Sequence, residues 1–232
     1  MTWGETSYRG DGTLLAMSDA PSERTQVRRL RERGRYDREL IDSILDEALI
    51  CHVGFVYEGG PVVIPTIHAR IGDTLYFHGS PASRMLRSMR SGDEICVNVT
   101  LIDGLVVARA AFHNSMNYRS VVVFGSPRIV EDREEKLVAM EAVTEHVIPG
   151  RWADSRTMTG KELKATLVAA LPLSEASAKV RTGGPNDDEA DYDLPIWAGV
   201  IPLTVAAGEP VVDPALRLDV AVPEYLSRYQ RP

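Results

Sequence analysis

Hydrophobic positions follow a helical spacing in one early part of the chain. They recur three and four residues apart at Leu40, Ile41, Ile44, Leu45, Ala48 and Leu49. Asp37 stands just before them, where an aspartate side chain can cap the first turn of a helix. The pattern therefore predicts a helix over 38–49. A shorter basic helix is predicted before it, from Ser22 to Gly34.

After residue 50 the pattern changes to short apolar runs separated by Gly, Pro, Asp and Ser, which is typical of β-strands. Residues 94–101 alternate between apolar and polar side chains, so one face of this strand should be buried and the other wetter. Asp103-Gly104 is typical of a hairpin turn. The predicted strands cover 51–57, 62–70, 75–78, 94–101, 105–112, 119–130 and 196–205.

Further helical patterns lie at the margins of these strands. They predict helices over 83–89, 131–147 and 223–229, and a helix followed by a strand over 165–181. Many short strands with marginal helices indicate a mainly β protein with added α, built as a barrel with flanking helices. We expect a flexible N-terminal arm over 1–21, one domain over 22–205 and a C-terminal extension over 206–232.

Composition narrows the class of protein. The chain has 232 residues, of which 44% are hydrophobic and 25% charged, so there is ample material for a core. Its formal net charge of −7 disfavours non-specific nucleic-acid binding, and no apolar stretch of about 18 residues predicts a membrane span. Arginines gather between Arg28 and Arg38, where a solvated helix face is expected. The sequence has two isolated cysteines, Cys51 and Cys96, which predict reduced thiols and no metal site. The N-terminal residues lack a signal-peptide pattern, so we expect a cytoplasmic protein.

The first group of candidate functional residues is His78-Gly79-Ser80-Pro81-Ala82-Ser83-Arg84. A strand ends here, small residues follow, and a helix begins. Backbone N–H groups at a helix start attract a phosphate, and the guanidinium of Arg84 matches its geometry. The alternative is a capped helix with a solvated arginine.

Two more groups stand at strand ends. Ser115-Met116-Asn117-Tyr118-Arg119-Ser120 precedes a very apolar run, as at the mouth of a barrel, although a polar hairpin loop would give the same pattern. Pro65 lies inside Val62-Val63-Ile64-Pro65-Thr66-Ile67-His68, which indicates an edge strand or a bulge. Such a strand can offer unpaired backbone groups to a flat ring, or carry no ligand at all.

These groups, in this order, resemble the pyridoxamine 5'-phosphate oxidase-like superfamily of FMN-binding split barrels. Within this superfamily, the chain resembles the branch that contains nitroimidazole-resistance and flavin-nucleotide-binding proteins. The resemblance runs from about Gln26 to Leu203. It is carried by ILDEALICHVGFV, PVVIPTIHAR, LYFHGSPASRML, DGLVVARAAFHNSMNYRSVVVFG and LPIWAGVIPL. It implies a six-stranded split β-barrel that forms a homodimer, with FMN at the subunit interface.

The resemblance also implies roles for individual residues. Ser83 and Arg84 match positions that hold the FMN phosphate, with Lys179 near it. The residues expected beside the flavin ring or on the strand that reaches it from the partner subunit are Val63, Ile64, Pro65, Thr66, His78, Gly79, Ser80, Asn117, Arg119, Ser120 and Trp197. His78 and Arg119 are the candidates for orienting a substrate or donating a proton.

The chain departs from the true oxidases in two places. Met85 follows Arg84 where those enzymes have a lysine, and 203–208 replace the motif that recognises pyridoxal phosphate. The resemblance therefore implies an FMN-dependent oxidoreductase acting on some other small molecule. The alternatives are a non-catalytic flavin-binding module for storage or sensing, and a binder of a deazaflavin or of haem. No histidine stands out in the sequence as an axial ligand.

Overall fold

The computed structural model describes residues 19–230. Most of the predicted N-terminal arm lies outside them. The helices are α1 (Arg38–Glu47), α2 (Arg84–Arg90), α3 (Arg133–Val147), α4 (Gly160–Ala165) and α5 (Glu224–Ser227), with short 3₁₀ turns at Arg31–Arg33, Ala111–His113 and Glu189–Asp191. The strands are β1 (Gly34–Arg35), β2 (Ile50–Tyr57), β3 (Gly60–Ile67), β4 (Ala69–Ile71), β5 (Thr74–Gly79), β6 (Ile95–Val107), β7 (Ser115–Gly125), β8 (Arg128–Ile129), β9 (Leu167–Pro172), β10 (Ala176–Arg181) and β11 (Gly199–Pro202).

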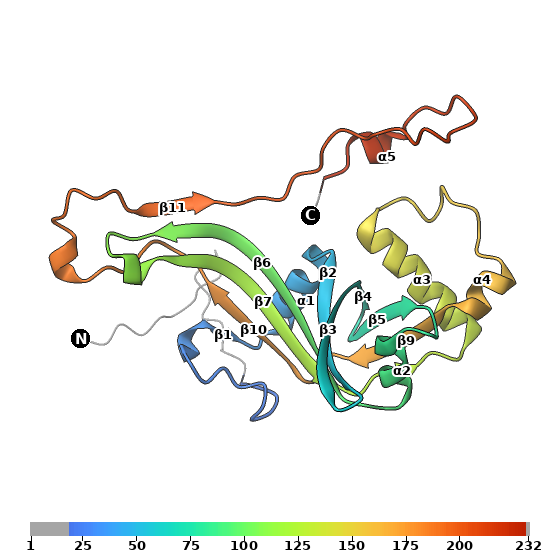
Figure 1. The fold of residues 1–232 in the computed structure, drawn as a ribbon, viewed down its shortest axis with the longest axis horizontal. Coiled ribbons are helices and arrows are strands. Elements are labelled where there is room, and N and C mark those ends of the chain that lie inside the picture. Colours follow the sequence, from blue (N-terminus) through green and yellow to red (C-terminus); the bar gives the residue numbers. More distant parts are fainter. Residues whose placement is uncertain (1–18, 231–232) are drawn as a thin grey trace.

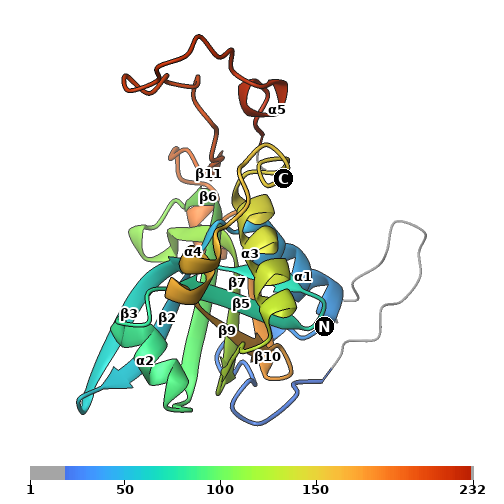
Figure 2. The same ribbon diagram turned by 90° about the vertical axis from the view of Figure 1, so that its right-hand side faces the viewer.

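The strands form two antiparallel sheets, which confirms a mainly β fold with added helices. Within the described residues, one sheet has seven strands in the order β1-β10-β7-β6-β2-β3, with β11 paired to β6. The other has four strands in the order β4-β5-β9-β8. The two sheets do not close into one continuous barrel. Helix α3 packs against β4 and β5, and α1 contacts β4, β7 and β10 (Figure 2).

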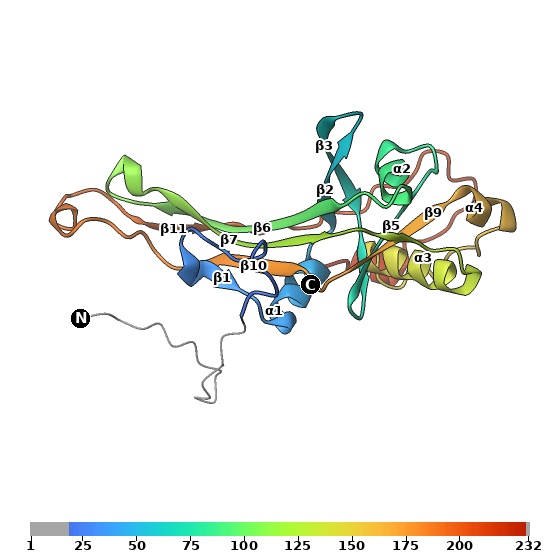
Figure 3. The same ribbon diagram turned by 90° about the horizontal axis from the view of Figure 1, so that it is seen from below.

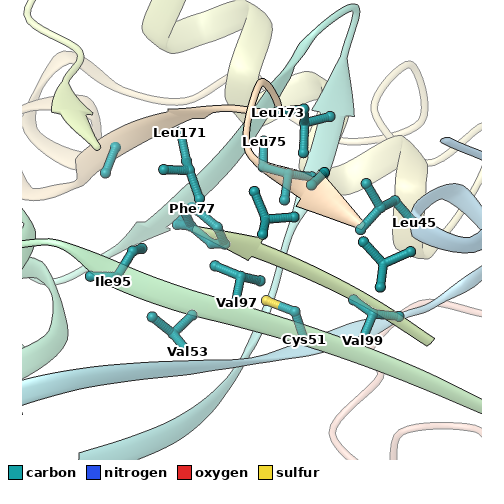
Figure 4. Close-up of a cluster of buried hydrophobic side chains, with 14 of the residues drawn as sticks. Leu45, Cys51, Val53, Leu75, Phe77, Ile95, Val97, Val99, Leu171 and Leu173 are labelled. Carbon is teal, nitrogen blue, oxygen red and sulfur yellow. The ribbon is translucent and has the colours of Figure 1, made fainter. Parts of the chain in front are cut away.

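The main core lies between the sheets. Phe77 and Leu75 of β5 meet Val97 of β6 and Cys51 of β2, and all four side chains are fully buried (Figure 4). Alternation along β5 places Tyr76 on the opposite face, in a smaller cluster with Val168 and Ala170 beside α3. Strand β5 is thus buried on both faces, and α1 buries one stripe of its surface.

Strands β6 and β7 extend beyond β2, β3 and β10 and form an arm, defined here as residues 102–118, to which β11 also pairs (Figures 1 and 3). The predicted hairpin at Asp103-Gly104 is wrong: β6 continues through these residues with a bulge. Gly104 is needed for close packing, because a Cβ there would lie 3.0 Å from the carbonyl oxygen of Ile201 in β11. The chain turns at Ala111–His113 instead.

Two other predicted elements differ. The basic segment from Ser22 to Gly34 is not a helix and contains only the 3₁₀ turn at Arg31–Arg33, preceded by Leu30 at φ 56°. Neighbouring arginines there repel one another and offer no apolar stripe to a core. Residues 165–181 form β9 and β10. Five consecutive residues of β9 are buried, so the strand lacks the alternation that would have identified it.

The C-terminal end of α1 is held by two histidines. His68 contacts the Leu45 carbonyl oxygen through Nε2 at 2.9 Å, and His146 of α3 contacts that of Ala48 at 2.7 Å. The two rings lie 5.0 Å apart. At its other end, the carboxylate of Asp37 accepts from the Leu40 N–H at 3.0 Å, which confirms the predicted cap.

Candidate functional site

The predicted phosphate position lies where β5 ends and α2 begins. The N–H of Ser83 donates to the Ser80 carbonyl at 2.9 Å, and the hydroxyl of Ser80 accepts from the Ala82 N–H at 3.2 Å. These bonds form a tight turn. At Gly79 a Cβ would lie 3.2 Å from a methyl carbon of Leu86, so a small residue lets the helix pack on the strand. The hydroxyl of Ser83 makes no cap with its own helix.

Arg84 projects from this turn into solvent. Its guanidinium lies 5.9 Å from the centre of the Tyr57 ring at the end of β2. No carboxylate of residues 19–230 lies within ion-pair distance of it, whereas Arg38, Arg70, Arg119 and Arg128 are each paired with one. Arg84 is therefore available to an anion.

Strand β3 is an edge strand, as Pro65 predicts. It pairs only with β2, and Pro65 stands opposite His52. Val63 is 65% exposed while Ile64 packs on the core. The outer edge of β3 consequently offers backbone groups beside Thr66 to whatever lies next to it.

His78 lies on the β5 face that carries Tyr76, because it pairs with Val168 of the smaller cluster. Its Nδ1 is buried and has no hydrogen-bond partner among the described atoms. Burial lowers the pKa of His78, so the ring is neutral at pH 7. A neutral, half-buried imidazole with an unengaged nitrogen can accept a hydrogen bond or bind a metal centre.

Arg119 is held between two carboxylates. Its Nε donates to Asp103 at 3.0 Å, one Nη donates to Asp103 at 2.7 Å, and the same Nη donates to Glu47 at 2.8 Å. Hydrogen bonds to Glu47 and then to Asp103 raise the pKa of Arg119 well above its usual range. We call Glu47, Asp103 and Arg119 the ion triad. It lines a cavity of about 300 Å³ with Leu101, Ile102, Leu203, Thr204 and Val205.

Neighbouring predicted residues are also engaged. Asn117 is buried: its oxygen accepts from Arg181 at 2.5 Å and its nitrogen donates to the Gly183 carbonyl at 3.0 Å. Ser120 donates to the backbone of Lys179, and Lys179 donates to the Arg29 carbonyl at 3.2 Å. Ser115–Gly125 is one continuous strand, so the polar stretch is part of β7 and not a loop.

The predicted site residues fall into two groups within one chain. Strand β3, the end of β5 and the start of α2 form one group on the body. Asn117, Arg119, Ser120 and Lys179 form the other, on β7 and β10, separated from β3 by β6 and β2. Trp197 is 65% exposed and lies before the short strand β11, so it is not in the last strand as predicted.

Three carboxylates that hold arginines in place were not predicted. Glu47 and Asp103 are ordinary surface residues in the sequence, and their partner Arg119 lies 72 and 16 positions away. Asp187 was assigned to a solvated acidic loop. It is buried, and it accepts from the backbone N–H of Arg109 at 3.0 Å and from its guanidinium at 3.0 Å. These bonds fasten the loop after β10 to the arm.

Comparison with known proteins places this fold in a family. The sequence profile of the pyridoxamine 5'-phosphate oxidase family matches residues 37–180, so the chain belongs to this family of flavin-binding proteins. No curated protein matches the chain.

Solved structures resemble the chain over most of its length. The flavocytochrome Anf3 from Azotobacter vinelandii is 41% identical, with a TM-score of 0.87 over 93% of this chain and 100% of its own. An FAD and heme binding protein from Mycobacterium smegmatis is 37% identical, with a TM-score of 0.79 over 83% of this chain and 95% of its own. A candidate 5-nitroimidazole antibiotic resistance protein from Bacteroides thetaiotaomicron is 26% identical, with a TM-score of 0.54 over 63% of this chain and 86% of its own.

None of the helices within residues 19–230 is long and apolar enough to cross a membrane. In the same part of the chain, no three His, Cys, Asp or Glu side chains gather to bind a metal ion directly. Burial raises the pKa of the Cys51 thiol to about 12, which makes it an inert core residue.

Proposed function

We propose that this protein is an oxidoreductase that carries a flavin and a haem and transfers electrons to or from a small molecule. The observation that carries the proposal is the 41% identity over 93% of the chain to a flavocytochrome. The second neighbour, at 37% identity, is described as binding both FAD and heme. The flavin supplies one- and two-electron transfer, and the protein positions it and excludes water.

For the flavin, the sequence predicts FMN, whereas the mycobacterial neighbour is described with FAD. Both nucleotides share the ring, the ribityl chain and the first phosphate. The unpaired Arg84 and the free hydroxyl of Ser83 suit that phosphate in either case. We propose FAD, because the neighbour named for it matches 83% of this chain. Mass spectrometry of the released cofactor distinguishes it from FMN.

For the haem, an axial ligand needs an imidazole with a ring nitrogen that is not already engaged. His68 and His146 are engaged by backbone carbonyls, and Nε2 of His113 lies 3.4 Å from Asp188. Of the five histidines, His52 and His78 keep rings without a described partner. One engaged nitrogen does not exclude a histidine, because metal-bound imidazoles usually donate the other ring N–H to a carbonyl or carboxylate. His68 is fully buried and cannot reach a bound group. An axial ligand from this chain would therefore come from the other four histidines, of which His52 and His78 have no described partner at either nitrogen.

We also propose that the protein acts as a homodimer with the flavin at the interface. One chain keeps its two groups of predicted site residues apart, and a second copy would bring the β7 group to the β3 and α2 group. Both cysteines are unpaired, which suits a reducing compartment such as the cytoplasm. A storage module would bind the same cofactors but would not turn over.

An absorption spectrum of the purified protein tests this proposal. We expect the bands of an oxidised flavin together with an intense Soret band, and both should change on reduction. Denaturation should release FAD. A colourless protein that takes up neither flavin nor haem on reconstitution would contradict the proposal. A protein that binds flavin but no haem would contradict the haem part and leave a simple flavoprotein.

The substitution Arg84→Ala is expected to weaken flavin binding by roughly 1.5–3 kcal/mol, the size of a lost charge-assisted hydrogen bond. Its matched control is Arg90→Ala at the other end of α2, which should leave the affinity unchanged. Fluorescence titration of the apoprotein measures both. Equal affinities for the two variants would mean that the phosphate lies elsewhere.

A further inference from the structure

The C-terminal part of the chain contains a segment that is anchored at both ends and exposed in between. We call residues 203–222 the strap. Before it, β11 pairs with β6 on the arm, and the N–H of Leu203 donates to the Asp103 carbonyl at 3.1 Å. After it, the hydroxyl of Tyr225 donates to Asp154 at 2.7 Å, and that of Tyr229 donates to the Val147 carbonyl at 2.9 Å. The strap therefore spans the molecule from the arm to the end of α3 (Figure 1).

Between these anchors the strap packs only loosely on its own chain, where Leu203, Thr204 and Val205 lie beside the ion triad. Every residue from 201 to 222 is exposed, and the hydrogen bonds described for 204–222 are all made within the segment. In Figure 2 the strap arches away from the sheets. Its composition is nevertheless that of a buried segment, because eight of its 20 residues are large aliphatics: Leu203, Val205, Val211, Val212, Leu216, Leu218, Val220 and Val222. Disordered segments are poor in such residues.

We propose that the strap lies against a second copy of this chain, so that each subunit of a dimer is embraced by the strap of the other. The proposal rests on the dimer proposed above and names the segment that holds it together. A stable interface uses about 20–30 residues on each side, and the strap alone supplies 20. In a two-fold dimer the strap is used twice, once by each subunit.

The same chain offers an apolar surface for the strap to cover. Val56 and Val63 on the β2–β3 hairpin are 60% and 65% exposed, and Ile102, Leu105 and Met116 of the arm are 49%, 40% and 47% exposed. These residues form two separate groups, one on β2 and β3 and one on β6 and β7, where Leu105 stands opposite Met116. Exposed apolar groups of this kind mark interaction surfaces. A second copy of this chain suits this surface, because each copy carries both a strap and a surface for the other strap to cover.

The strap also connects the interface to the ion triad. Leu203, Thr204 and Val205 line the cavity that contains Glu47, Asp103 and Arg119. A partner that presses on the strap would therefore close this cavity and exclude water from the triad. The interface and the candidate site would form as one unit.

Sedimentation velocity of the holoprotein tests the proposal with the double substitution Leu216→Asp and Leu218→Asp. Both side chains are exposed in the single chain, so the subunit should still fold, as circular dichroism would show. We expect the wild type to sediment at about twice 25.5 kDa and the variant at the mass of one chain, with dimer affinity at least 100-fold weaker. Val138→Asp, on the exposed face of α3, is the control and should stay dimeric.

The outcomes separate the strap from the dimer. A monomeric wild type would overturn the dimer and the strap proposal together. A dimeric wild type with an equally dimeric strap variant would overturn the strap proposal alone.

A second measurement needs no variant. Tryptic cleavage after Arg217, inside the strap, should slow at least 10-fold as the protein concentration rises through the dissociation range, relative to cleavage after the exposed Arg156. Protection of Arg217 that does not depend on concentration would place the strap on its own chain.

Discussion

Replacing Arg119 with alanine is expected to lower the free energy of unfolding by about 3 kcal/mol, because two half-buried carboxylates lose a shared cationic partner. The side chains of Arg119, Glu47 and Asp103 are 27%, 31% and 32% exposed, so water compensates only part of the loss. The triad also ties α1 to β6 and β7, which are far apart in sequence. Urea denaturation at fixed protein concentration measures the change.

A double-mutant cycle separates the triad from general effects of truncation. Asp103→Asn should cost more in the wild type than in the Arg119→Ala background, because in the second case it also relieves the repulsion from Glu47. Arg119→Lys keeps the charge but not the fork of donors, and should recover about half of the loss. A loss below about 1 kcal/mol for Arg119→Ala would show that the triad behaves as an ordinary surface ion pair.

Acidification from pH 7 to pH 4 is expected to reduce stability through His68 by about 3 kcal/mol. Burial lowers the pKa of His68 from 6.5 to about 4. Below pH 6.5 the unfolded chain takes up a proton that the folded chain refuses, so stability falls with pH until the folded pKa is reached. About two thirds of the loss should occur above pH 5, before most carboxylates titrate.

His68→Gln is the matched variant for this prediction. A glutamine amide can still donate to the Leu45 carbonyl oxygen but does not titrate. Comparing the unfolding free energies of the two proteins between pH 7 and pH 5 isolates His68 from His78, whose pKa is also lowered by burial. Parallel profiles for wild type and variant would mean that His68 becomes protonated in the folded state without cost.

Local patterns determined much of the fold. The apolar stripe and Asp37 predicted α1, a short apolar run predicted β2, alternation predicted the first part of β6, and Pro65 predicted an edge strand, all as observed. The turn of small residues before Arg84 likewise gave the strand-to-helix junction where an anion can bind. Each of these features depends on residues within about one or two turns of chain, which is why the sequence by itself predicts them.

Tertiary structure decided the rest. The sequence shows a glycine at position 104, but only the packing of β11 explains why it continues a strand and does not turn a hairpin. The sequence shows the apolar run of β9, but only its position between β5 and β8, buried on both faces, makes it a strand. The two carboxylates that hold Arg119 come from distant segments, and no local pattern encodes such contacts. The apolar composition of the strap predicts burial, and only the structure shows that the single chain leaves it exposed.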